Sequence, residues 1–260
     1  MIVRFNMINK KEISYIIIAV FLIALIMVLE KLSLKNYLWA LLMAAVMILF
    51  HVAGYKILAW RFGSKAEIKF WEVSRFGFRP QYTFRTPVPL WLLFPLFLVI
   101  ISSGVIKWFS IFSVNIKGTA RRAKYRWMRE KEIDTAVVAS GGALFSLILA
   151  TISYSLGFRE FALYNGWFAV LTILPLGVIG ILLATLVRSD TVLMGDYPGT
   201  KIFFNSLMYF TFFLVMTIAM LIMMYLKLNI ILIIIAAILL GFVIMVSFMD
   251  KIMKGTGYYW

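Results

Sequence analysis

The chain contains no cysteine and only one histidine, His51, among its 260 residues. Without cysteine it cannot form a disulfide, a thiolate metal site or a cysteine nucleophile. A catalytic zinc ion normally takes three protein ligands from histidine, cysteine and carboxylate side chains, and that inventory is nearly empty here. We therefore expect no metal ion and no other cofactor.

Acidic residues are also few, because Asp and Glu number 11 against 26 Lys and Arg. None of the 11 falls well inside an apolar block, whereas proton relays and cation-coupled transporters place carboxylates within the membrane. Charged residues make up only 14% of the chain and hydrophobic residues 63%. A soluble domain of that composition would expose large apolar patches to water. A soluble fold is excluded on these grounds, and cation transport is not expected.

The apolar residues are grouped in blocks of about 20, the length that crosses a bilayer core of roughly 30 Å. No internal repeat or linker divides the chain. We therefore predict an all-α polytopic membrane protein that forms one membrane domain over residues 1–260. The seven apolar blocks are Tyr15–Leu29, Tyr37–Trp60, Pro87–Trp108, Thr135–Leu156, Phe161–Val187, Ile202–Leu226 and Asn229–Met249.

Basic residues predict how these blocks are threaded, because cytoplasmic loops carry an excess of Lys and Arg. The block Pro87–Trp108 lies between two strongly basic regions, residues 61–85 and 117–131. A spanning block would place one of these regions outside, whereas a re-entrant block keeps both inside. We predict about six transmembrane helices plus this re-entrant segment, in the cell membrane, with both termini cytoplasmic. Seven spans are the alternative.

The segments that flank the re-entrant block alternate polar and apolar residues with a period of two, which is typical of strands. Strand edges cannot be left unpaired against lipid. We therefore predict one small membrane-associated β-sheet at the cytoplasmic interface. The segments are Glu67–Phe70, Arg75–Arg79, Tyr82–Arg85 and Phe112–Lys117.

A basic stretch over residues 119–134 follows the last of these segments. Tyr125 and Trp127 within it suit the level of lipid headgroups. We expect a helix that binds anionic lipid, with a ribosome or another RNA as the alternative partner. The residues assigned to the lipid are Arg121, Arg122, Lys124, Arg126 and Arg129.

The end of the second block carries the most informative motif, Leu49-Phe-His-Val-Ala-Gly-Tyr-Lys-Ile-Leu-Ala-Trp-Arg-Phe-Gly63. A lone histidine in an apolar helix is more often a packed side chain than a ligand. This stretch, however, resembles the zinc-motif helix of the site-2 protease family of intramembrane metalloproteases, in its archaeal form. The positions that match in register are Phe50, His51, Lys56, Ala59, Phe62 and Gly63.

Further motifs follow in the order that the family has. Gly142-Ala-Leu-Phe-Ser146 stands where the family carries G-P-x-x-N, and Thr172-Ile-Leu-Pro175 stands where it carries N-L-L-P. The stretch Gly199–Phe204 resembles the tail of the family's D-G-x-K-[IV]-F motif. The resemblance implies a first span over 1–36, a site-2-protease-like core over 37–204 and C-terminal spans over 205–260.

The departures from the family concern its catalytic residues. The family uses two zinc-binding histidines four residues apart, with a glutamate general base beside the first. Here His51 is retained, Val52 replaces the glutamate and Tyr55 replaces the second histidine. Pro198 or Gly180 stands at the position of the later aspartate ligand. The resemblance therefore implies a catalytically inactive pseudoprotease without catalytic or metal-binding residues.

We expect from this that the protein is not an enzyme and that it binds or regulates membrane-protein partners. The alternatives are an insertase or translocon accessory, a structural subunit of a membrane complex and, last, an active intramembrane metalloprotease. His51, Lys56 and Lys107 are the ionisable residues that fall inside the apolar blocks. The two lysines either extend their ammonium groups toward the cytoplasm or line a polar cleft.

Overall fold

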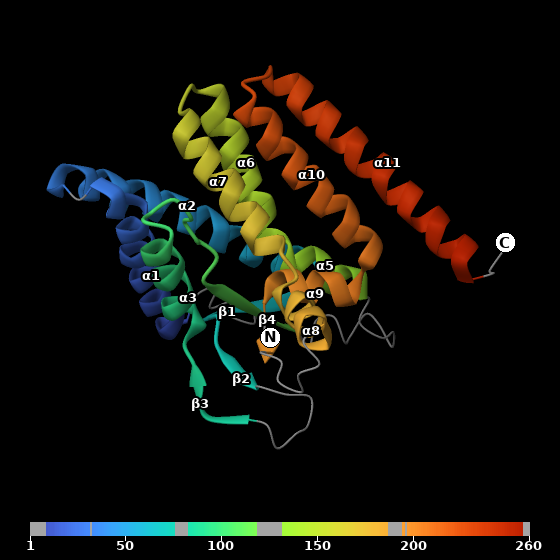
Figure 1. The fold of residues 1–260 in the computed structure, drawn as a ribbon, viewed down its shortest axis with the longest axis horizontal. Coiled ribbons are helices and arrows are strands. Elements are labelled where there is room, and N and C mark those ends of the chain that lie inside the picture. Colours follow the sequence, from blue (N-terminus) through green and yellow to red (C-terminus); the bar gives the residue numbers. More distant parts are fainter. Residues whose placement is uncertain are drawn as a thin grey trace, which may run out of the picture.

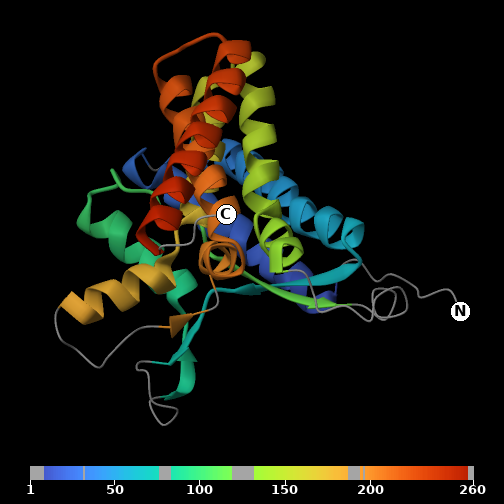
Figure 2. The same ribbon diagram turned by 90° about the vertical axis from the view of Figure 1, so that its right-hand side faces the viewer.

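The computed structural model describes residues 9–31, 33–75, 83–118, 132–186, 194–195 and 197–256. This part of the chain is mostly helical, with short strands at one end of the helices (Figures 1 and 2). The predicted helical class is confirmed. The helices are α1 (Lys10–Val28), the 3₁₀ turn Leu29–Lys31, α2 (Leu34–Arg61), α3 (Leu90–Ile101), α5 (Glu132–Ala139), α6 (Gly141–Ser155), α7 (Arg159–Ile173), α8 (Leu176–Leu186), α9 (Pro198–Asn205), α10 (Leu207–Tyr225) and α11 (Ile230–Thr256).

Four helices, α1, α2, α10 and α11, are long and apolar enough to cross a membrane. Two bent pairs raise that number to six if each pair is one span. In these pairs α5 meets α6 at 43° and α7 meets α8 at 53°. By length and composition, the described helices fit an integral, polytopic membrane protein.

The bend between α7 and α8 has a local cause. Pro175 has no backbone N–H, and its ring disfavours the helical conformation of the preceding residue. Leu174 accordingly has φ −54° and ψ 127°, outside the helical region. The predicted block Phe161–Val187 therefore contains two helices that change direction at Leu174–Pro175.

Residues 90–111, which include α3, form a hairpin, called the α3 hairpin below, whose two ends are both bonded to the backbone of Trp71. Its helix has 12 residues, about 18 Å at 1.5 Å per residue, which is shorter than a bilayer core. The N–H of Trp91 donates to the carbonyl of Trp71, and the N–H of Trp71 donates to the carbonyl of Ile111, both at 2.9 Å. Gly104 makes the turn at the tip with φ +89°. A re-entrant segment has this shape, and its depth in a membrane stays a prediction.

The strands form two small sheets. β1 (Ser64–Phe70) pairs antiparallel with β4 (Phe112–Gly118) in one continuous register. β2 (Val73–Arg75) lies between β3 (Thr83–Val88) and β5 (Met194–Gly195).

The prediction of a single sheet is therefore wrong. The backbone of Trp71 bonds to both ends of the α3 hairpin, so the chain leaves the first sheet there and β1 does not continue into β2. The predicted strand residues 76–79 and 82 lie outside the described part of the chain.

Helix α2 packs between α1 and α6, and it runs at a steep angle to α6 and α7 (Figure 1). From α6 the series continues through α7 and α10 to α11, which lies at the outer edge (Figure 1). This order places the faces of α2, α6 and α7 that carry the motif residues in the interior of the fold.

Candidate functional site

Two glycines bring the backbones of α2 and α6 into direct contact. A Cβ atom on Gly54 would overlap the carbonyl oxygen of Gly141, and one on Gly141 would lie 2.7 Å from the carbonyl oxygen of Gly54. Small residues allow membrane helices to approach this closely. The contact sets the motif positions of the two helices against each other.

His51 lies within one turn of this contact and is 1% exposed. Its Nδ1 is 2.9 Å from the Oγ of Ser146 on α6. The imidazole ring stacks on Phe168 of α7 with 4.1 Å between ring centroids, and it meets the ring of Tyr55 edge-on at 5.1 Å. The predicted positions His51 and Ser146 are therefore direct neighbours, and the imidazole is enclosed by protein.

The backbone of Gly142 packs directly against the side chains of both His51 and Tyr55. A Cβ atom on Gly142 would lie 2.6 Å from Nε2 of His51 and 2.6 Å from Cε2 of Tyr55. Among the described residues, neither this Nε2 nor the Tyr55 hydroxyl has a hydrogen-bond partner of good geometry. The main chain of α6 thus lies directly against His51 and Tyr55, the two positions that the sequence resemblance would align with zinc-binding histidines.

This arrangement does not fit a zinc ion. Only His51 offers a ligand nitrogen on this face of α2, and its Nε2 faces Gly142. Val52, at the position of the family's general base, is 3% exposed and has no group that accepts a proton. Within the described ranges, no three His, Asp or Glu side chains gather into a group that could hold a metal ion.

Thr172 and Pro175 lie at the end of α7, next to the same cluster. The Thr172 hydroxyl is buried, donates to the carbonyl of Phe168 at 2.8 Å and lies 3.2 Å from the Oγ of Ser110. Phe168 carries the ring that stacks on His51, so Thr172 belongs to the same cluster. Pro175 ends α7 and contributes to the site only by setting that end.

Tyr197 and Ser110 are two members of the cluster that were missed from the sequence. Tyr197 directly precedes α9, is fully buried, and donates from its hydroxyl to the carbonyl of Leu171 at 2.6 Å. This bond reaches α7 one residue before Thr172, beside the cluster. Burial raises the pKa of Tyr197 far above its usual value, so this hydroxyl stays protonated. The sequence feature that could have indicated this contact is Gly199, two residues after Tyr197. A Cβ atom there would overlap carbonyl groups at the end of α7, so only glycine allows α9 to approach α7 this closely.

Lys56 lies outside the polar cluster, in a buried ion pair. Its Nζ is 2.6 Å from Oε1 of Glu12 and 2.7 Å from the carbonyl oxygen of Ala66. The same carboxylate oxygen accepts the N–H of Ile68 at 2.9 Å. The two charged side chains are only 11% and 6% exposed. This lysine therefore joins α1, α2 and β1 at the strand end of the helices.

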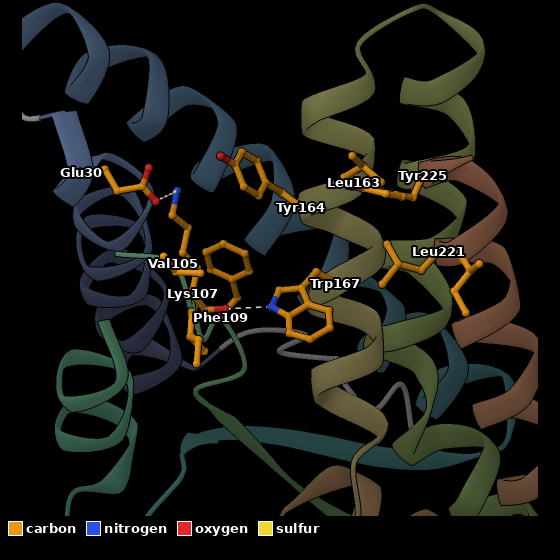
Figure 3. A pocket seen from close by; sticks show the side chains of 11 residues that line it. Glu30, Val105, Lys107, Phe109, Leu163, Tyr164, Trp167, Leu221 and Tyr225 are labelled. Carbon is orange, nitrogen blue, oxygen red and sulfur yellow. Dashed lines mark hydrogen bonds and ion pairs between the residues drawn. The ribbon is translucent and has the colours of Figure 1, made fainter. Parts of the chain in front are cut away.

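Lys107 lies beyond the opposite end of α1, beside a cavity of about 530 Å³ (Figure 3). Its Nζ is 3.1 Å from Oε1 of Glu30 and 5.6 Å from the ring centroid of Tyr164. Glu30 lies about 27 Å along the helix from Glu12, the partner of Lys56, at 1.5 Å per residue. The two lysines therefore lie in separate places rather than in one cleft.

The basic stretch expected to bind anionic lipid or RNA falls on residues 119–131, outside the described part of the chain. Both expectations stay predictions. The residues concerned are Arg121, Arg122, Lys124, Arg126 and Arg129.

Comparison of the chain with protein-family models, with curated proteins and with solved structures gives no match. The resemblance to site-2 proteases is therefore neither supported nor contradicted by these comparisons, and it stays a prediction from the sequence motifs.

Replacing Ser146 by alanine is expected to lower the free energy of unfolding by about 1–3 kcal/mol, because Nδ1 of buried His51 would lose its partner. The matched control is Ser155→Ala on the same helix, where an exposed hydroxyl bonds only to the carbonyl of Ile152, and we expect a change within about 0.5 kcal/mol. Denaturant titration in detergent micelles measures both. Equal losses for the two variants would contradict the His51–Ser146 contact.

Proposed function

We propose that this chain is a non-catalytic integral membrane protein with a site-2-protease-like core, and that it binds or regulates a membrane-protein partner. One observation carries the proposal. Motif positions from α2, α6 and α7 meet in one buried cluster, and the space opposite His51 is filled by Gly142. A core that keeps this arrangement without its metal ligands and base acts by binding rather than by hydrolysis.

The contact between His51 and Ser146 has the length of a base–nucleophile hydrogen bond. Two observations argue against serine hydrolase chemistry. Both side chains are at most 1% exposed, so a scissile bond cannot reach Ser146 without separation of α2 from α6. No carboxylate in the described residues orients the ring, because Nε2 faces the main chain of Gly142. We therefore infer that the contact between His51 and Ser146 stabilises the fold and has no catalytic role.

The orientation that we propose is six spans with the strand end of the helices in the cytoplasm and with cytoplasmic termini. Exposed basic side chains gather on or next to the strands, whereas few lie at the opposite helix ends, and an excess of Lys and Arg marks the cytoplasmic side. The described basic residues at the strand end include Arg61, Lys65, Lys69, Arg85 and Lys117. The exposed ones described at the other end are Lys35, Arg159 and Lys227.

Single cysteines test this orientation without background, because the chain has none of its own. Arg85→Cys and Lys117→Cys lie on the two sides of the hairpin, and both are expected to react with an impermeant maleimide only from the cytoplasmic face. Arg159→Cys, at the start of α7, is expected to react only from the other face. Labelling of Arg85→Cys and Lys117→Cys from opposite faces would restore a seventh span.

The partner is tested by affinity purification of the full chain from native membranes, followed by reciprocal purification of each recovered protein. We expect an intact membrane protein in a fixed molar ratio to the chain, retained in the variant His51→Phe because the cluster is closed to partners. Ribosomal proteins in its place would favour the insertase alternative. Membrane-protein fragments that accumulate with the native chain and disappear in His51→Phe would show an enzyme and overturn the proposal.

A further inference from the structure

The cavity beside Lys107 has one polar end and apolar walls (Figure 3). At the polar end, the ammonium group of Lys107 and the carboxylate of Glu30 are 3.1 Å apart. The hydroxyl of Tyr164 points toward this pair (Figure 3). The rest of the wall is formed by α7, α10 and the segment that returns from the hairpin tip.

Lys107 is held in place, whereas its partner is accessible. The lysine side chain is 14% exposed and the Glu30 side chain is 43% exposed. Lys107 Nζ lies 3.4 Å from the carbonyl of Met27 and also interacts with the Tyr164 ring. The cavity thus presents a fixed positive group next to a negative group that faces outward.

Trp167 gives the apolar wall a fixed surface. Its Nε1 donates to the main-chain carbonyl of Lys107 at 2.9 Å, so the only polar atom of the indole is already bonded. The remaining ring surface contributes to the cavity together with Leu163, Leu221 and Ile222. Such a surface accepts a hydrocarbon chain without leaving a polar atom unpaired.

The two ends of the cavity match the two parts of a membrane lipid. Glu30 lies two residues beyond the end of α1, in the 3₁₀ turn, and Tyr225, which also lines the cavity, is the last residue of α10. Ends of spanning helices lie at the headgroup level, and the apolar wall extends from there along α7 and α10. The volume of about 530 Å³ falls in the range of roughly 300–1,000 Å³ typical of ligand sites.

We infer that this cavity binds one phospholipid whose headgroup carries both a phosphate and an amine, as in phosphatidylethanolamine. The phosphate lies at Lys107, the ammonium group lies at Glu30, and one hydrocarbon chain lies along Trp167. A headgroup with a phosphate alone would place its charge next to the Glu30 carboxylate with no amine to compensate it. The inference requires the membrane location but not the proposed partner.

The experiment adds a mixture of phosphatidylethanolamine and phosphatidylglycerol in equal amounts to the full chain and counts retained lipids by native mass spectrometry. We expect one phosphatidylethanolamine per chain, retained at least fivefold over phosphatidylglycerol. Lys107→Met and Glu30→Gln should each lower this retention at least fivefold. Lys35→Met is the charge control, because Lys35 lies on a separate groove beside α2, and it should retain the lipid as the native chain does.

A second variant keeps the ion pair and fills the cavity. Ile222 is 53% exposed and lines the cavity, so Ile222→Trp should remove the retained lipid without changing thermal unfolding. Ile235→Trp makes the same change at an exposed position of α11 and should have no effect. Equal retention of the two lipids, or full retention in Ile222→Trp, would mean that the cavity is only solvated by bulk lipid and would overturn the inference.

Discussion

Replacing Glu12 by glutamine is expected to lower the free energy of unfolding by about 3 kcal/mol, which is the loss typical when one partner of a buried ion pair is removed. Glutamine keeps the shape of the side chain and can still accept the N–H of Ile68, so the change isolates the charge. Lys56 is 11% exposed and would be left without its counter-charge. Titration with a denaturing detergent in mixed micelles measures the loss.

A second ion pair gives the matched control. Glu67 and Lys117 are 3.0 Å apart on the paired strands β1 and β4, with side chains 28% and 59% exposed. Exposed pairs contribute about 0–1 kcal/mol, so Glu67→Gln should change stability by less than about 1 kcal/mol. The double variant of Glu12→Gln with Lys56→Met should lose less than the sum of the single losses. Additive losses, or equal losses in Glu12→Gln and Glu67→Gln, would contradict the buried pair.

Replacing Gly54 by alanine is expected to destabilise the fold by about 3 kcal/mol, because the added methyl group would overlap the backbone of Gly141. Overpacking of a tight interior typically costs about 1–3 kcal/mol, and backbone atoms yield less than side chains. The same substitution separates α2 from α6 and therefore also lengthens the contact between His51 and Ser146. Thermal unfolding in detergent measures this effect.

Gly166→Ala is the control for that substitution. A Cβ atom there would lie 3.0 Å from Cδ1 of Leu221, and this flexible side chain can move away. We expect a loss of less than about 1 kcal/mol, since only a rotamer has to adjust. A loss in Gly166→Ala as large as that in Gly54→Ala would contradict the direct backbone contact between Gly54 and Gly141.

The helices were the most predictable part of the fold. Long apolar blocks indicate helices wherever they occur, and four of them form the helices that are long enough to cross a membrane. The bend at Pro175 was visible in principle, because proline disfavours a helical conformation in the residue before it. The division of the strands into two sheets was not visible, because it depends on long-range backbone bonds of Trp71. β5 has two residues, too few for any periodicity.

The candidate site was predictable in its helical parts. His51 and Tyr55 are four residues apart, as are Gly142 and Ser146, and such pairs share one helix face. The fold brings these two faces together. Tyr197 could not be found in this way, because it lies outside a helix and reaches the cluster only through the position of α9. Glu12 was also missed, because it precedes the first apolar block and is buried by contacts with Lys56 and Ile68, which lie far along the chain.

We propose that a closed cluster around His51 stands at the position that the sequence resemblance would assign to the zinc centre of a site-2 protease. Elemental analysis of the full chain, purified without chelators from membranes of cells supplied with zinc, is the decisive test of this proposal. We expect far less than one zinc ion per chain, with the same content in the variant His51→Ala. One zinc ion per chain in the native protein, lost in His51→Ala, would contradict it.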